Sequence, residues 1–317
     1  MSGLWYGVAA YSIWGLFPLY WKLVSHVPAL QILGHRIVWS FLALIVLTTV
    51  ARRRDAQASP WSVPRQVIGL YAIAAVLIGV NWFLYVYAVN AGFVVETSLG
   101  YFITPFVNVL LGVVVFRERL RPAQWAAVAI AAAGVAYLTR VYGSVPWVAA
   151  GLATSFGSYG LVKKKAPLDS LRGLTLETAV LAPAAAVYLA TLYFNGGGSF
   201  LRSGLPSDLL LVGGGLVTIG PLLLFATAVR RVPLTIVGLL QYISPTIQFL
   251  LGIFLYHEPL SRTQLIGFGM VWTAIVVFSA DSLRVRVKSR QVEKWKSGEL
   301  ALALLFSLST SLLLHFS

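Results

Sequence analysis

The sequence contains no cysteine, which excludes disulfide bonds, thiolate catalysis and cysteine-ligated metals. Charged residues are also scarce, because Asp, Glu, Lys and Arg make up 11% of the 317 residues, against about 25% in a typical soluble domain. No phosphate-binding loop ending in Gly-Lys-Ser/Thr, no His-Glu-x-x-His zinc motif and no Ser-His-Asp set is recognisable. We therefore expect neither an enzyme nor a cofactor, metal or ATP-hydrolysing site.

Hydrophobic residues make up 58% of the chain. They come in runs of about 20, the length that lets a helix cross a ~30 Å hydrocarbon core. The first run begins at Gly3 without a basic leader or a cleavage site, so we interpret it as a retained helix and not as a signal peptide. We predict ten spans, at residues 3–24, 28–50, 66–90, 95–116, 121–140, 145–163, 172–194, 208–230, 235–256 and 260–280.

The net charge of +14 is typical of nucleic-acid-binding proteins, but the positions of the basic residues indicate a membrane topology instead. With the N-terminus in the cytoplasm, most Lys and Arg residues fall in cytoplasmic loops and the C-terminal tail. The opposite side receives Arg140, Arg202 and Arg262. This is the positive-inside pattern. We expect the lipid bilayer as a partner and no nucleic acid, and we leave the oligomeric state open.

The chain contains an internal repeat, a feature that decides the fold wherever it occurs. A shift of 140 positions aligns residues 95–139 with 235–279 without a gap, so that Pro105 meets Pro245 and Glu118 meets Glu258. We therefore predict a first unit at 1–140, a second at 141–280 and a tail at 281–317. Because each unit has an odd number of spans, the second enters the membrane inverted. The predicted fold class is an all-α polytopic membrane protein, with ten transmembrane helices in two inverted five-helix repeats.

Inverted repeats point to a class of function. They build secondary transporters, in which the substrate site lies near the midplane where the two copies face each other. A channel is the alternative that the same symmetry allows.

The tail changes character along its length. Residues 281–298 are basic and polar, which suits an anionic inner leaflet. Residues 300–316 are apolar again but are interrupted by Ser and Thr. This end is either an interfacial helix, a segment without a role in the fold, or an eleventh span; we favour the first two.

The repeated prolines lie in the middle of their spans. A proline inside a helix frees the carbonyl four residues earlier, here that of Tyr101 for Pro105 and of Gln241 for Pro245. Irregular backbone in a membrane is tolerated against protein or a water-filled cavity. The two kinks, with Tyr242 beside the second, therefore mark either a substrate cavity or a packing adjustment.

Two adjacent ionisable residues, His35 and Arg36, lie inside the second span. An arginine there costs about 2.5–3.5 kcal/mol on insertion scales, so it must face the protein interior, an acid or a bound anion. Glu177 is the nearest counterpart in the second unit. The two either form an ion pair or hold the carboxylate and the amine of a zwitterion. His35 either carries a proton or is hydrogen-bonded in the core.

Aromatic and amide residues form stripes at helical spacing. Trp14 lies at mid-depth in the first span, and Asn81 and Tyr85 form a mixed stripe in the third. Such stripes are either core packing or the lining of a cavity. A lining of this kind suits a flat or amphipathic organic molecule and not a bare ion.

Other charged residues have structural interpretations. Lys22 lies at the outer end of the first span, where its amine can reach the interface. Glu96 lies at the start of the fourth span and favours a helix N-terminus. Glu118 and Glu258 lie at interfacial turns, where we expect them to fix the turn and the helix start.

Five motifs carry a family resemblance. They are Tyr11-Ser-Ile-Trp-Gly-Leu-Phe-Pro-Leu-Tyr20, Val27-Pro-Ala-Leu-Gln-Ile-Leu-Gly-His-Arg36, Asn81-Trp82 with Ala88-Val-Asn90, Leu99-Gly-Tyr-Phe-Ile-Thr-Pro105 and Leu240-Gln-Tyr-Ile-Ser-Pro245. They resemble the RarD branch of the drug/metabolite transporter superfamily, and the two units resemble EamA domains. The resemblance covers about residues 1–285. It implies ten helices with both termini cytoplasmic, the bacterial inner membrane, and a permease-like role with a chloramphenicol-sensitivity label.

We therefore expect an inner-membrane secondary transporter, a permease or exporter of a small organic metabolite or drug-like molecule, that works by alternating access. A coupling proton or a counter-substrate would drive it. The alternative is a membrane-embedded ligand-binding or receptor protein without net transport. The candidate substrate-binding residues, with helix kinks at Pro105 and Pro245, are Trp14, His35, Arg36, Asn81, Tyr85, Tyr101, Glu177, Gln241 and Tyr242.

Overall fold

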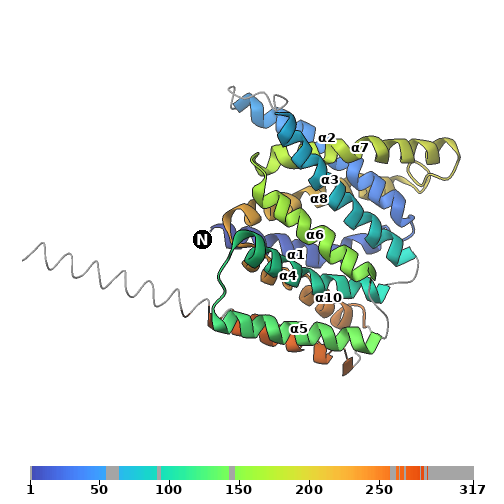
Figure 1. Ribbon diagram of the computed structural model, residues 1–317. Coiled ribbons are helices and arrows are strands. Elements are labelled where there is room, and N and C mark those ends of the chain that lie inside the picture. Colours follow the sequence, from blue (N-terminus) through green and yellow to red (C-terminus); the bar gives the residue numbers. More distant parts are fainter. Residues whose placement is uncertain are drawn as a thin grey trace, which may run out of the picture. The chain divides into compact units, whose positions relative to one another are not determined.

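The computed structural model describes residues 2–54, 64–90, 94–142, 147–257 and 262–284, the last range with gaps at 264, 268, 279, 282 and 283. Within these ranges every regular element is a helix (Figure 1). The helices are α1 (Ser2–Leu23), α2 (Ala29–Arg54), α3 (Arg65–Asn90), α4 (Val94–Phe116), α5 (Pro122–Tyr142), α6 (Trp147–Lys165), α7 (Ser170–Phe194), α8 (Leu205–Arg231), α9 (Leu234–Leu240) and α10 (Ile243–Phe254). A further apolar helix covers Leu265–Phe278.

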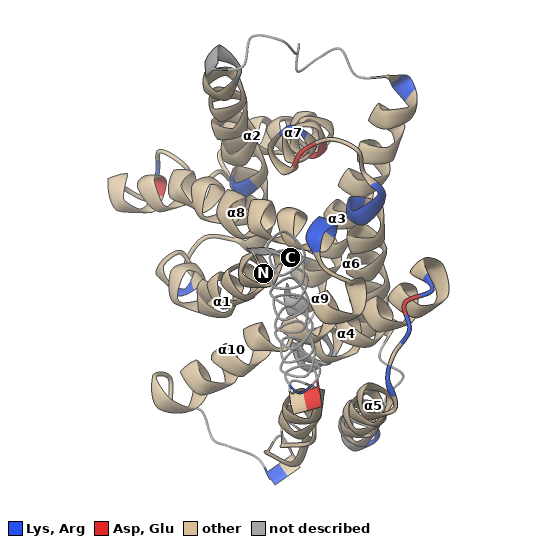
Figure 2. Cartoon of the chain, turned by 90° about the vertical axis from the view of Figure 1, so that its left-hand side faces the viewer, with Lys and Arg blue, Asp and Glu red and all other residues tan. Residues whose placement is uncertain are grey.

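The composition of the helices fits a bilayer. Six helical spans in the described ranges are long and apolar enough to cross a membrane. Charged residues sit mostly near helix ends and in connecting segments, and the helices between are largely uncharged (Figure 2). In lipid, a helix is the structure that satisfies every backbone N–H and C=O within its own segment. The chain is therefore a polytopic all-α membrane protein.

Prolines and one acidic residue set several helix starts. Pro122 opens α5, Pro206 lies in the first turn of α8, and Pro233 precedes α9. Proline is favoured there because the N–H that it lacks would have no intrahelical partner in the first turn of a helix. Asp169 caps α7, because its carboxylate accepts the N–H groups of Leu171 and Arg172 at 3.0 Å each.

The predicted spans and the helices agree except near the second repeated proline. The first eight predicted spans each correspond to one helix, α1 to α8, within a few residues. The ninth, 235–256, is broken into α9 and α10 by a turn at Gln241 and Tyr242. The Gln241 carbonyl was expected to be free, but it accepts the Ser244 N–H at 3.2 Å. The chain therefore accommodates Pro245 with a tight turn in which the Gln241 carbonyl is hydrogen-bonded, and the carbonyl is not left free.

Some predictions fall partly or wholly outside the described residues. The tenth predicted span, 260–280, is described only in part, through Leu265–Phe278. The side chains of Glu96 and Glu258 and most of the tail lie outside. The count of ten transmembrane helices and their inverted arrangement stay predictions.

The chain separates into two compact units. The larger comprises residues 1–119 and 134–268, and the smaller 120–133 and 269–317. In the smaller unit, Arg121 Nε donates to Asp281 Oδ2 at 2.6 Å. This bond ties the start of α5 to the segment after Leu265–Phe278.

In the larger unit, α6 packs between α3 and α4, and the three helices lie side by side (Figure 1). α8 packs on α1 and α2, α7 packs on α2, and the pieces α9 and α10 pack on α4 and α1. The core lies where α1, α3, α6, α8 and α9 meet. Its largest side chains, buried almost completely, are Tyr11, Tyr159 and Phe225.

Candidate functional site

The larger unit contains a partly open cavity of about 250 Å³. Helices α1, α2, α3, α4, α6, α8 and α10, together with the turn before α10, contribute to its wall. The sequence-predicted residues that line it are Trp14, Arg36, Asn81, Tyr85, Tyr101, Gln241 and Pro245. The folded chain therefore brings together, from both halves of the sequence, most of the residues that the sequence singled out.

Arg36 extends from α2 into this cavity. Its guanidinium carbon lies 4.9 Å from the ring centroid of Trp21 and 4.9 Å from that of Trp82, so the cation makes contacts with two indoles. Its Nε donates to Thr218 Oγ1 on α8 at 3.1 Å. Thr218 in turn donates to the Gly214 carbonyl at 2.7 Å. Cation–π contacts of this kind contribute about 0.5–2 kcal/mol each.

Aromatic rings form much of the remaining wall. Trp14 packs against Tyr11, Phe156 and Phe225, with ring centroids 5.4, 6.0 and 5.7 Å apart. Tyr11 is 1% exposed. Its hydroxyl has no hydrogen-bond partner among the described residues. Leaving a buried hydroxyl without a partner costs about 1–3 kcal/mol of stability.

Amide side chains supply polar groups at fixed positions. Asn81 Nδ2 donates to the Leu152 carbonyl at 2.9 Å and to Ser155 Oγ at 3.0 Å, which ties α3 to α6. Gln241 Oε1 accepts from Asn108 Nδ2 at 3.0 Å. Both amides are therefore held in one orientation at the edge of the cavity.

Four sequence-predicted residues do not line the cavity, and three of them serve packing. His35 Nδ1 accepts from Trp39 Nε1 at 3.2 Å, and its ring packs on Phe200. The Tyr242 hydroxyl donates to the Phe102 carbonyl at 3.3 Å. Pro105 lies at the contact between α4 and α9. Its carbonyl oxygen is so close to Gly238 that a Cβ added to this glycine would stand 2.8 Å from it.

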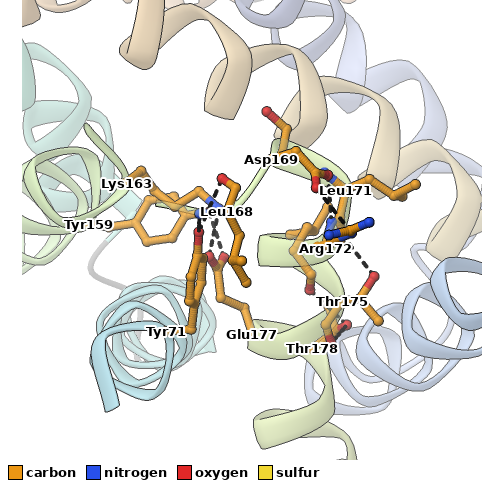
Figure 3. Close-up of polar contacts among 12 residues, drawn as sticks. Tyr71, Tyr159, Lys163, Leu168, Asp169, Leu171, Arg172, Thr175, Glu177 and Thr178 are labelled. Atoms are coloured by element: carbon orange, nitrogen blue, oxygen red, sulfur yellow. Dashed lines mark hydrogen bonds and ion pairs between the residues drawn. The ribbon is translucent and has the colours of Figure 1, made fainter. Parts of the chain in front are cut away.

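Glu177, the fourth, has a different partner from the one expected. It forms an ion pair with Lys163 of α6, with Nζ and Oε1 2.6 Å apart, and accepts from the Tyr159 hydroxyl at 2.9 Å (Figure 3). Lys163 Nζ also lies 5.4 Å from the ring centroid of Tyr71 on α3. The expected pairing of Glu177 with Arg36 is therefore wrong, and so is a zwitterion site that uses both.

The sequence analysis missed Lys163 because the positive-inside pattern assigned it to a cytoplasmic loop. A signal was present, however. Tyr159 and Lys163 are four residues apart, so they share one face of α6, and a single carboxylate can reach both side chains.

Glu118, in the segment between α4 and α5, forms a second polar cluster with residues of α6 and α9. Its carboxylate accepts the N–H groups of Leu234 and Thr235 at 2.8 and 3.0 Å and pairs with Lys164 at 3.0 Å. It was expected to serve a helix start beside it in the chain, but it caps α9. Partial burial raises the pKa of Glu118, but the hydrogen bonds from Thr235, Leu234 and Lys164 outweigh it, so the pKa lies below its ordinary value.

The sequence profile of the EamA-like transporter family matches the chain twice, over residues 1–140 and 144–280. The chain belongs to this family. Protein RarD of Streptomyces exfoliatus is 45% identical over 289 residues, which cover 91% of each chain. The transporter YojE of Bacillus subtilis, whose name carries the word uncharacterized, is 43% identical over 302 residues, or 91% of this chain and 97% of YojE. These relatives confirm the resemblance to the RarD branch of the drug/metabolite transporter superfamily.

A solved crystal structure shares the fold of this EamA-like transporter. It has a TM-score of 0.67 and 19% identity, and the match covers 90% of this chain and 98% of the other. At that identity the likeness concerns the fold alone. With the apolar helices and the bacterial relatives, the family membership makes the chain a multi-pass bacterial membrane transporter of the drug/metabolite type.

Proposed function

We propose that this EamA-like protein is a secondary transporter of a small organic molecule, and that the substrate occupies the cavity around Arg36. The observation that carries the proposal is that both repeats of the sequence contribute residues to the cavity wall. Arg36, Asn81 and Tyr101 come from the first family match, and Phe156 and Gln241 come from the second. Transporters built from two repeats bind their substrates at such an interface.

The size of the cavity supports an organic substrate. At the ~30 Å³ that one water molecule occupies in the liquid, about 250 Å³ holds about eight waters. That volume suits a small metabolite and greatly exceeds what a bare ion needs. The aromatic and amide wall also matches the usual composition of small-molecule sites.

The position of the cavity along α6 supports alternating access. Leu152 and Phe156 line the cavity, Tyr159 lies in the aromatic core, and Lys163 lies near the helix end in its pair with Glu177. The positive-inside pattern assigns that end to the cytoplasm. We therefore propose that the cavity lies in the outer half of the membrane and that this is an outward-facing state. The core and the ion pairs of Lys163 and Lys164 then close the inner half, and two inverted repeats exchange these roles in the inward-facing state.

Counterflow in proteoliposomes tests the proposal. Vesicles containing the purified full chain are loaded with an unlabelled ligand and diluted into the same ligand carrying a label. A transporter gives a transient lumenal excess of label that saturates with concentration. A receptor, the alternative function, gives saturable binding without a lumenal pool, and a channel gives neither saturation nor counterflow.

A further inference from the structure

Among the described residues, no carboxylate pairs with the cation in the cavity. Arg36 forms no ion pair with any acidic side chain that the structure describes, and each of those acids is bound elsewhere. Their partners are Lys164 for Glu118, Lys163 for Glu177, Arg121 for Asp281, the N-terminus of α7 for Asp169, and the Leu201 N–H for Asp208. A charged residue inside a membrane span pairs with another charge or with backbone carbonyls, or faces a water-filled cavity, and such residues mark substrate pathways.

The guanidinium is oriented for a ligand. Its Nε donates to Thr218, and its guanidinium carbon contacts the rings of Trp21 and Trp82. No described residue accepts a hydrogen bond from its two terminal nitrogens. Those nitrogens present four N–H donors in a planar fork. Such a fork matches the two oxygens of a carboxylate, and the paired hydrogen bonds are stronger than neutral ones.

The rest of the wall is neutral. Among the described residues that line the cavity, Arg36 alone is charged. The remaining polar groups are hydroxyls and amides, including the unpartnered hydroxyl of Tyr11. An amine on the ligand therefore meets no acid in this wall, because Glu177 is held by Lys163. This disfavours both an organic cation and a zwitterion.

We propose that the ligand of this cavity is a small organic monoanion, with a carboxylate on the terminal nitrogens of Arg36 and a flat apolar body against the aromatic wall. The proposal rests on the transporter function proposed above and names its substrate class. Bound in this way, the anion neutralises Arg36, the one charged side chain among the described residues of the wall.

Ligand binding to the wild-type protein tests the class without any substitution. The melting temperature of the detergent-purified full chain is measured with benzoate, phenylacetate and indole-3-acetate, and with the neutral amide of each. Phenethylamine and phenylalanine represent the cation and the zwitterion. We expect carboxylates to raise the melting temperature, since a ligand of the native state stabilises it. We expect each amide to bind at least about thirtyfold more weakly, as for the loss of a buried charged partner.

Variants then assign the effect to the residue. Arg36→Gln should abolish carboxylate stabilisation, Arg36→Lys should keep part of it, and Thr218→Val should weaken it by releasing Nε. Glu96, whose side chain lies outside the described residues, is tested with Glu96→Gln. The proposal expects unchanged affinity, and markedly tighter carboxylate binding would overturn it by showing that Glu96 neutralises Arg36.

The two proposals fail in different ways. An amide or amine that binds as well as its carboxylate, and shows counterflow, overturns the anion class and leaves the transporter function standing. A carboxylate that binds through Arg36 but yields no lumenal pool keeps the class and overturns transport. If no carboxylate binds the wild-type protein, the anion class is wrong.

Discussion

Lys163 and Glu177 form an ion pair 2.6 Å long, and their side chains are 2% and 1% exposed. The pair joins α6 to α7, and Tyr159 supplies a second hydrogen bond to the same carboxylate (Figure 3). Two charges removed from water in this way are costly, and their attraction offsets the cost only while both are present. The pair is therefore a structural element whose two members depend on each other.

Glu177→Gln should destabilise the protein by about 3–5 kcal/mol, because it leaves the Lys163 charge buried without a partner. Thermal unfolding of the purified protein measures this. The double variant Lys163→Met/Glu177→Met should recover most of the loss, since it removes both charges. Carboxylate affinity, corrected for stability, should not change in either variant. If Glu177→Gln changed ligand affinity at unchanged stability, Glu177 would belong to the site after all.

The close approach of α8 to α2 predicts a contrast between two glycines of one helix. A Cβ added to Gly215 would stand 2.6 Å from Trp39 Cβ and 2.7 Å from the Ser40 backbone nitrogen, whereas one added to Gly220 meets nothing within 4 Å. Gly215→Ala should cost about 1–3 kcal/mol through overpacking.

Gly220→Ala is the matched control, and it should stabilise the helix by about 0.5–1 kcal/mol. The melting temperatures of both variants check the contrast. Equal effects would mean that α2 and α8 do not approach each other as described.

The stability of the protein should depend on pH through the ionisation of Glu118. Because the folded-state pKa of this carboxyl lies below its ordinary value of 4.5, the ionised form stabilises the fold. That contribution is complete above the ordinary pKa and is lost as the pH falls through the folded-state pKa.

Glu118→Gln should therefore lower the melting temperature at pH 7, and the gap to the wild type should narrow toward pH 3. Other titrating groups are common to both proteins and cancel in the difference. A gap that stays constant over this range would show that the Glu118 charge does not carry the cap on α9.

The contacts of two indoles with Arg36 predict a loss of ligand affinity when one indole is removed. Trp82→Leu removes one of the two cation–π contacts of Arg36, so it should weaken carboxylate binding by about two- to thirtyfold, the equivalent of about 0.5–2 kcal/mol. Phe83→Leu alters the next residue of α3, which is 55% exposed and does not line the cavity. This control should leave the affinity unchanged. Equal losses in the two variants would contradict a role for the Trp82 contact in binding.

The sequence predicted the helices well because long apolar runs in a bilayer have few structural alternatives. It also identified Arg36, Asn81 and Tyr101 of the cavity wall, since a polar or charged residue inside a span must face protein or a ligand. The sequence correctly associated a helix break with Pro245. It predicted a free Gln241 carbonyl, however, whereas in the structure this carbonyl accepts the Ser244 N–H in the turn between α9 and α10.

The errors concern which side of a helix a residue faces and what packs there. Successive helical positions are about 100° apart, so Arg36 faces the cavity while His35 binds Trp39. The partner of Glu177 depends on how α6 and α7 pack, and neither composition nor spacing within one span determines that packing.

The most direct test of the central claim, alternating access to one cavity, uses the absence of cysteine from the chain. Asn81→Cys places a thiol in the cavity wall, and Ala74→Cys places one in the aromatic core two turns earlier on α3, at a residue that is 0% exposed. A membrane-impermeant thiol reagent is then applied to right-side-out and to inside-out vesicles, with and without a transported ligand.

The account predicts that Asn81→Cys is labelled from the outside at rest. It also predicts that Ala74→Cys is labelled from the inside alone, and faster while the ligand is being exchanged. Labelling of Asn81→Cys from the inside at rest, as fast as from the outside, would indicate a channel. If Ala74→Cys stayed unlabelled from the inside during exchange, alternating access through this cavity would be contradicted.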